Sequence, residues 1–365
     1  MHWSRKWPMD AARMKGFDLL EVHGSAFDRG FAYGERHADR LRRHILSHYD
    51  FYSTYFARSK DELIREAAKY ADPLKDYSQN VWDEVRGTAD GAGVSLDEIM
   101  FLTAFNEVFY PKFEKLCTAF AVRGRSTADG LTYVGQNNDE GIDPWMNGEC
   151  VTLTRHLQSD APNVLIYTYV GAPAMMGINS RGLAVCINAL ACDGPQVGVP
   201  ILAIVREVLN QKDMDGAIGE IQRAKRAYSL NFVMGTSETI ADVEAYPDRV
   251  LTQHSDSVLW HTNHCLYSEG MKYENEQSRM NSETRCSRIE ALLASNDGRL
   301  DLRRLEGFMA DHENGTNSIC LHVDPNKPKP KQERTLDSMI YVPDKREAWL
   351  ANGNPCEVDF QRYTV

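Results

Sequence analysis

The first third of the chain has apolar residues at the spacing of amphipathic helices, with polar residues between them. Ser95 and Glu98 form a capping box that defines the start of one helix, and Pro111 is expected to end it. Gly30 and Gly34 lie four residues apart on one predicted helix face, which allows a neighbouring element to pack closely there. The predicted helices cover Phe27–Tyr52, Asp61–Ala71, Tyr77–Gly87 and Leu96–Tyr110.

After Lys115 the pattern changes to short runs rich in β-branched and aromatic residues, which predict strands. The first two, Thr118–Val122 and Leu131–Val134, flank a polar turn and predict a β-hairpin. Further strands are predicted at Val151–Leu157, Val164–Val170, Gly182–Leu190, Leu230–Gly235, Ile240–Tyr246, Val258–His261, Ile319–His322 and Ser338–Val342. Helices are predicted at Ile201–Asn210, Asp215–Ala224 and Ser287–Ser295. This grouping favours antiparallel sheets flanked by helices over a doubly wound parallel sheet.

The composition is that of a soluble globular protein, with 42% hydrophobic and 25% charged residues among 365. The net charge of -11 argues against a nucleic-acid partner and against a polybasic membrane surface. The sequence contains neither a membrane-spanning run nor a secretory signal, so we expect a cytoplasmic protein whose eight cysteines are mostly buried thiols. Glycine-rich nucleotide motifs and C-x-x-C spacing are absent, so neither a cofactor nor a metal is expected.

Cys117 stands where the helical pattern gives way to the strand pattern, and Asp139 follows about twenty residues later in a Gly-Gln-Asn-Asn-Asp string. Taken alone, a cysteine before a strand is usually a core residue, and such a polar string is usually a turn. His261 and His264, with Asp311 or His312, offer ligands for a metal site. However, two residues three apart on a strand point to opposite faces, so these two histidines converge poorly.

Several segments resemble, in the same order, those of the acyl-coenzyme A:6-aminopenicillanic-acid acyltransferase family, in the N-terminal-nucleophile (Ntn) hydrolase superfamily. The resemblance spans nearly the whole chain, and the shared order of the motifs carries it. The segments are Val22–Gly30 with Gly34, Phe105–Glu107, Cys117–Phe120, Gly135–Asp139, Gly171–Val185, His261–His264, Ser282–Arg288, Asp311–His312 and Ala351–Pro355.

The resemblance implies an α+β fold, the four-layer αββα sandwich with two antiparallel sheets between helical layers. It also implies a precursor that cleaves itself between Leu116 and Cys117. A mainly helical segment 1–116 and a sheet-rich segment 117–365 then stay together as one Ntn-hydrolase-like domain. The new α-amino group of Cys117 has an ordinary pKa near 8, close to that of the thiol, and serves as the base for it.

The resemblance assigns three catalytic residues. Cys117 is the nucleophile, Asp139 orients the new ammonium group, and Asn263 donates its side-chain amide to the oxyanion. Arg285 or Arg288 is expected to bind a substrate carboxylate or Asp139. Weaker candidates for lining the substrate pocket are Asn137, Asn188, Met175 and Ser318.

The leading hypothesis for function is an amidohydrolase that cleaves an N-acyl amide through a thioester on Cys117. An acyltransferase that passes the acyl group to an amine is the first alternative. An unprocessed, non-catalytic binding homologue and a metallohydrolase are the others. The expected partners are a small-molecule N-acyl amide or acyl donor and the chain's own second fragment. Homo-oligomer formation and the identity of the substrate are left open by the sequence.

Overall fold

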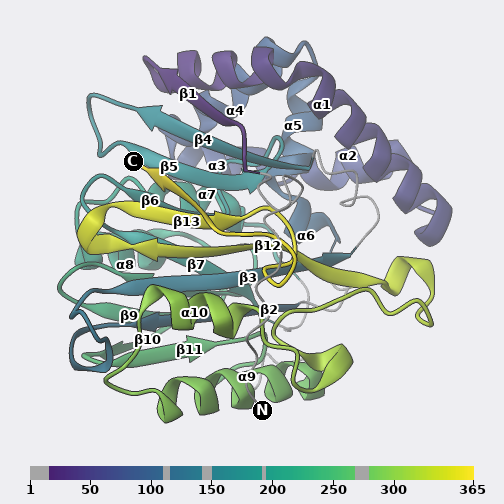
Figure 1. Cartoon of the computed structure of the whole chain (residues 1–365). Coiled ribbons are helices and arrows are strands. Elements are labelled where there is room, and N and C mark those ends of the chain that lie inside the picture. Colours follow the sequence, from purple (N-terminus) through teal and green to yellow (C-terminus); the bar gives the residue numbers. More distant parts are fainter. Residues whose placement is uncertain (1–15, 110–115, 142–149, 191–194, 268–278) are drawn as a thin grey trace.

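The computed structural model describes residues 16–109, 116–141, 150–190, 195–267 and 279–365 (Figure 1). Two sheets pack face to face, and helices cover the outer face of each sheet. The fold is therefore a four-layer αββα sandwich, as predicted from the resemblance. Within these residues, no helix combines the length and the apolarity that a membrane span requires.

The eight-stranded sheet has the order β1-β4-β5-β6-β7-β8-β9-β10. Its strands are β1 (Leu19–His23), β4 (Val151–Leu157), β5 (Val164–Tyr169), β6 (Met176–Asn179), β7 (Ala184–Ala189), β8 (Leu230–Gly235), β9 (Ile240–Ala245) and β10 (Val250–Ser255). All neighbours pair antiparallel except β1, which runs parallel to β4 at the edge. The prediction of two antiparallel sheets is thus correct except at this edge strand.

The six-stranded sheet has the order β11-β2-β3-β12-β13-β14, and all its neighbours are antiparallel. Its strands are β2 (Leu116–Val122), β3 (Tyr133–Gly141), β11 (Val258–His261), β12 (Glu333–Val342), β13 (Glu347–Ala351) and β14 (Gln361–Thr364). The predicted hairpin is confirmed as β2 and β3, with Cys117 directly opposite Asn138.

Among the described residues, one group of helices lies on the side of the eight-stranded sheet and a smaller group on the side of the six-stranded sheet (Figure 1). The first group is α1 (Ala26–Phe56), α2 (Lys60–Ala68), α3 (Ala71–Tyr77), α4 (Gln79–Ala92), α5 (Leu96–Thr103), α6 (Phe105–Phe109), α7 (Ile201–Val208) and α8 (Met214–Arg223). The second is α9 (Arg279–Ser295) and α10 (Leu302–Met309). The capping box at Ser95 is confirmed.

Three sequence predictions differ from the structure. The expected helix Leu96–Tyr110 is interrupted at Ala104, where φ is -105° and ψ is 26°, so α5 and α6 are separate helices. Tyr110 and Pro111 lie outside the described residues. Ile319–His322 is not a strand, because its backbone groups bond to different elements rather than to one neighbouring strand. The strands β1, β6, β10, β13 and β14 and the helices α3 and α10 were not predicted, since most are short or have weak patterns.

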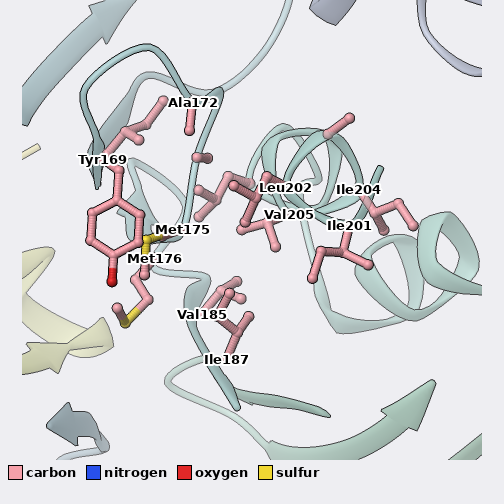
Figure 2. Packing of buried hydrophobic residues seen from close by; sticks show 14 of the residues in the cluster. Tyr169, Ala172, Met175, Met176, Val185, Ile187, Ile201, Leu202, Ile204 and Val205 are labelled. Atoms are coloured by element: carbon pink, nitrogen blue, oxygen red, sulfur yellow. The ribbon is translucent and has the colours of Figure 1, made fainter. Parts of the chain in front are cut away.

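Apolar side chains form the core between the layers. Figure 2 shows Leu202 and Val205 of α7 facing Val185 and Ile187 of β7, with Met175 beside them. A separate apolar cluster joins α9 and α10 to the six-stranded sheet. Both sheets are therefore anchored to helices on one face and to each other on the other face, which fixes the position of the β2–β3 hairpin.

The helices α1 and α4 pack so closely that each presents glycine to the backbone of the other. A Cβ added at Gly30 would lie 2.1 Å from the carbonyl oxygen of Glu84, and one at Gly34 would lie 2.3 Å from that of Thr88. On α4, a Cβ at Gly87 or Gly91 would meet the α1 backbone at 2.2 or 2.1 Å. The close approach expected at Gly30 and Gly34 is confirmed.

We expect Gly34→Ala to destabilise the protein by about 1–3 kcal/mol, because the added methyl must push apart two backbones. This outweighs the roughly 0.5–1 kcal/mol that alanine normally gains over glycine within a helix. The measurement is urea unfolding. Gly219→Ala on α8 is the matched control, since a Cβ there meets nothing within 4 Å and should show only the helix gain. Equal effects at the two positions would contradict the packing argument.

Candidate active site

Cys117 lies at the start of β2 and lines a cavity of about 30 Å³, room for about one water molecule. The cavity lies where the two sheets meet α6 and α7. It is also lined by Asn106, Gln136, Asp139, Met175 and Leu202. Cys117 is partly exposed, whereas the apolar residues that follow it in β2 are buried. It is thus not an ordinary core cysteine, and Met175 lines the cavity as the sequence predicts.

The backbone of Cys117 is held on both sides of its Cα atom. Its N–H donates to Oδ1 of Asn263 at 2.7 Å, and its carbonyl oxygen accepts from Nη1 of Arg285. Asn263 follows β11, which pairs with β2 through His261 opposite Ala119, so sheet register brings its amide to Cys117. The strand end that carries the thiol is therefore fixed by two side chains distant in sequence.

Asn263 is oriented by its whole set of partners. Its Oδ1 accepts from both Cys117 and Nη2 of Arg285, the latter at 2.9 Å, while its Nδ2 donates to the carbonyl oxygen of Ala189 at 2.9 Å. Because both partners of Oδ1 are donors, the amide cannot be flipped. The expectation that Asn263 donates to an oxyanion is therefore not met in this conformation, where it accepts from the Cys117 backbone.

Arg285 on α9 is only 1% exposed and uses all three guanidinium nitrogens. Besides Cys117 and Asn263, it donates to Oγ1 of Thr118 at 3.1 Å and from Nε to Oδ1 of Asn281 at 2.8 Å. All four acceptors are neutral. Burial lowers the pKa of Arg285, and the nearby charge of Asp139 opposes this shift. Arg285 thus places a positive charge beside the candidate nucleophile.

Asp139 lies on β3, directly opposite Leu116, and is 3% exposed. Its Oδ1 accepts from Oγ1 of Thr335 at 2.5 Å, and its buried Oδ2 has no hydrogen-bond partner among the residues that the structure describes. Burial raises the pKa of Asp139 from 3.8 to about 7, although Arg285 opposes the shift. The carboxyl group is therefore close to half-ionised at neutral pH.

The side chains of Cys117 and Asp139 leave the hairpin on opposite faces. Thr118 and Asn137 face each other and contact the α9 and α10 side, so by strand alternation the Asp139 carboxyl faces that side too. The thiol of Cys117 faces the other sheet. Burial raises the pKa of this thiol to about 12, and the charge of Asp139 adds to the shift. The thiol is thus neutral in the uncleaved chain and needs a base to react.

Comparison with known proteins adds the family to this geometry. The family model for acyl-coenzyme A:6-aminopenicillanic acid acyl-transferase matches residues 125–357. The chain belongs to this acyltransferase family. The match contains Asp139, Asn263 and Arg285 and begins just after Cys117.

One curated relative of this acyltransferase-family chain is the acyl-coenzyme A:6-aminopenicillanic-acid-acyltransferase 40 kDa form of Emericella nidulans. It is 25% identical over 310 residues, which cover 82% of this chain and 81% of the relative. Among solved structures, a conjugated bile acid hydrolase from Clostridium perfringens is 11% identical with a TM-score of 0.43, over 68% of this chain and 97% of that one. A penicillin V acylase from Agrobacterium tumefaciens is 13% identical with a TM-score of 0.41, over 64% and 82%.

Gln136 is a residue of the acyltransferase-family site that the sequence analysis missed. Its Oε1 accepts from the backbone N–H of Ile187 at 2.8 Å, which orients the amide. Its Nε2 is buried and has no hydrogen-bond partner in the described part of the chain, and Gln136 lines the cavity together with Cys117. Strand alternation within Gly135–Asp139 places Gln136 and Asn138 on the same face as Cys117, which is the signal that would have identified it.

Asn263 and Arg285 contact Cys117 without lining the cavity, and four further sequence candidates neither line the cavity nor bond to Cys117. Asn137 donates to the carbonyl oxygens of Met309 and Ile319 on the α10 side, because it has the opposite alternation from Gln136. Ser318 donates to the carbonyl oxygen of Cys320. Arg288 pairs with Asp311 and Glu313 near the surface. Asn188 is buried opposite Asn231 in the sheet, and its amide has no hydrogen-bond partner from the described segments.

Within the described residues, His261 and His264 bond to separate groups and do not form the metal site that the sequence offered as an alternative. Nε2 of His261 lies 3.1 Å from Oε1 of Glu244. Burial lowers the pKa of His261, but the charges of Asp242 and Glu244 outweigh burial and raise the pKa to about 9. His264 instead contacts Oγ of Ser282 at 2.8 Å. The two rings have separate partners, and neither Asp311 nor His312 joins them.

Asp139→Asn tests the buried carboxyl in a Cys117→Ala background, in which the thiol is absent from both proteins compared. A carboxyl whose pKa is higher in the folded state makes the folded protein less stable as the pH rises from about 4, the pKa in the unfolded chain, to about 7, the pKa in the folded protein. We expect the stability of Asp139→Asn, relative to its parent, to rise through this window by up to about 1.4 kcal/mol per pH unit. Urea unfolding at several pH values measures this. The exposed Asp297→Asn is the control, and a flat difference for Asp139→Asn would contradict the assignment.

Proposed function

We propose that this acyltransferase-family chain is a self-processing enzyme that transfers acyl groups from amides through a thioester on Cys117. The observation that carries the proposal is the double hold on the Cys117 backbone by Asn263 and Arg285, with the thiol left in a cavity. A core cysteine needs no such fixed surroundings. A nucleophile does, because attack requires a defined approach to the carbonyl carbon.

The processing step starts from the intact Leu116–Cys117 bond. The thiol of Cys117 adds to the carbonyl carbon of Leu116, the C–N bond breaks, and the nitrogen takes the thiol proton, which leaves a thioester. Water then cleaves the thioester to give the carboxylate of Leu116 and the free thiol and amine of Cys117. The N–H of Cys117 already donates to Asn263 at 2.7 Å, which favours retention of the nitrogen in place as the bond breaks.

The freed amine supplies the base that the uncleaved chain lacks. Its ordinary pKa is about 7.7–8, so a neutral fraction is present at neutral pH to accept the thiol proton. We assign to Asn263 the task of holding this amine through Oδ1, in place of the oxyanion role expected from the resemblance. Asp139, whose Oδ2 has no hydrogen-bond partner, would be ionised by the new positive charge nearby and would balance it.

The thioester-forming steps place negative charge on a carbonyl oxygen, and Gln136 is our candidate donor to it. Its Nε2 has no hydrogen-bond partner within the described residues, although it is buried beside the cavity. Its amide is already oriented by Ile187, so little reorganisation is needed when the charge develops.

Replacing Gln136 with Met should lower kcat for the processed enzyme about 10²–10³-fold with little change in KM, since a lost oxyanion donor costs roughly that much. Gln253→Met, at an exposed position of β10, is the matched control and should leave kcat unchanged. Steady-state kinetics on an N-acyl amide provide the measurement. An unchanged kcat in Gln136→Met would remove Gln136 from the mechanism.

Cys117→Ala should abolish both processing and activity. The purified parent should run on a denaturing gel as two bands, corresponding to residues 1–116 and 117–365, and the larger should begin with Cys117 on N-terminal sequencing. The variant should give a single band. Cys150→Ala is the control: it removes a buried thiol directly before β4, and this variant should process normally. One full-length band from the parent would contradict self-processing, and the absence of activity from that band would favour the unprocessed binding homologue.

Between the two outcomes of the thioester we favour hydrolysis. Hydrolysis needs only water to resolve the thioester, whereas transfer also needs a binding place for an amine acceptor and exclusion of water. Acyl transfer is the second candidate, because the curated relative named above is an acyltransferase. Processed enzyme is incubated with an N-acyl amide, with and without an acyl-CoA plus an amine. Release of free acid as the main product supports hydrolysis, and predominant formation of the new amide overturns that preference.

A further inference from the structure

Four side chains with metal-binding chemistry converge near the surface, on the far side of β12 from the cavity. They are His312, Cys320, His322 and Cys356, and the candidate ligand atoms all lie within 4.8 Å of one another. Three come from the segment after α10, and the fourth comes from the turn between β13 and β14. Cys320 is buried, Cys356 is partly buried, and the two histidines are exposed.

The spacing of these atoms matches the edges of a tetrahedron around zinc. Zn–S bonds of about 2.3 Å and Zn–N bonds of about 2.0–2.1 Å give edges of roughly 3.3–3.8 Å. The sulfurs of Cys320 and Cys356 lie 3.6 Å apart, and Nε2 of His322 lies 3.3 Å from the sulfur of Cys356. Nε2 of His312 lies 3.1 Å from that of His322, and the sulfur of Cys320 lies 3.9 Å from Nε2 of His322; the two pairs that join His312 to the cysteines lie within 4.8 Å.

We propose that His312, Cys320, His322 and Cys356 bind one Zn²⁺ ion in a tetrahedral site. Two thiolates and two imidazoles are a donor set that zinc prefers over the harder divalent ions. All four positions come from the protein, so no position is left for water or substrate. The site is therefore structural rather than catalytic. Zinc binding here does not depend on the proposed function of Cys117.

Polar side chains next to the four ligands are placed to orient them. Nδ2 of Asn354 donates to the sulfur of Cys320 at 3.5 Å. Nδ1 of His322 lies 3.7 Å from Oε1 of Glu357, so the ring nitrogen away from the metal faces a carboxylate. The two histidines reach solvent, which provides an entry path for the ion.

The site would hold the segment that supports Asp139. Leu321 lies between two of the ligands; its N–H donates to Oγ1 of Thr335 at 2.8 Å, and its carbonyl oxygen accepts from Asn354 at 2.8 Å. The same Thr335 hydroxyl donates to Asp139. Zinc would thus link the turn after β13 to the carboxyl group of Asp139, through Leu321 and the hydroxyl of Thr335.

The test is the metal content of the purified full chain. After dialysis against metal-free buffer, elemental analysis should find about one zinc per chain in the parent. Cys320→Ser and His322→Ala should each lose nearly all of it. Cys286→Ser and His254→Ala, which replace the same residue types outside the cluster, should retain it. The exposed His322 is included because its replacement should leave folding intact even if the buried Cys320 does not tolerate serine.

A second readout uses cobalt in place of zinc. Co²⁺ added to the zinc-free parent should give the intense visible bands of tetrahedral cobalt and a thiolate charge-transfer band, both absent in Cys356→Ser. Three results would overturn the proposal: no zinc after dialysis, zinc content unaffected by His322→Ala, or a Cys320–Cys356 disulfide found by non-reducing peptide mapping of the purified protein. None of them bears on whether Cys117 processes the chain.

Discussion

The arrangement around Cys117 depends on the buried guanidinium group of Arg285. It joins the carbonyl oxygen of Cys117 to the amide oxygen of Asn263, and so connects α9, β2 and the segment after β11. A buried cation with only neutral hydrogen-bond partners is expensive unless a negative charge lies near it. Asp139 is the carboxyl whose charge most supports the ionised form of Arg285. Arg285 thus provides both the hydrogen bonds that fix the Cys117 backbone and the positive charge that faces Asp139.

This charge balance differs between the uncleaved chain and the proposed product. With the Leu116–Cys117 bond intact, Arg285 is the cation beside Asp139, and burial still raises the pKa of the carboxyl to about 7. Cleavage would add an ammonium group at Cys117 and favour full ionisation of Asp139. The new amine would be the base for the thiol, and the ionised carboxyl would balance the positive charge of the amine once it has taken the proton. An uncleaved chain has a neutral thiol and no such amine.

Much of this was accessible from sequence, and the failures have physical reasons. The alternation of side chains along Gly135–Asp139 separates Gln136, which lines the cavity, from Asn137, which does not. Likewise, the buried face of α9 includes Ser282, Arg285 and Ile289, which selects Arg285 over Arg288. Periodicity would have made both choices. The contact of Asn263 with Cys117 depends on the register between β11 and β2. The convergence of Cys356 with His312 depends on how the chain after β13 packs against the segment after α10. No local sequence pattern encodes either.

The sheet topology explains how two fragments would remain one molecule after cleavage. Residues before Cys117 supply β1, which pairs with β4 over five residues, and the helices that cover the eight-stranded sheet. Leu116 is itself paired with Asp139 at the end of β2. Breaking the bond after Leu116 would therefore leave in place the β1–β4 ladder and the buried ion pair between Glu84 of α4 and Arg206 of α7, both of which join the two fragments. Because these contacts are as extensive as those within a single domain, the fragments are expected to separate only when the whole sandwich unfolds.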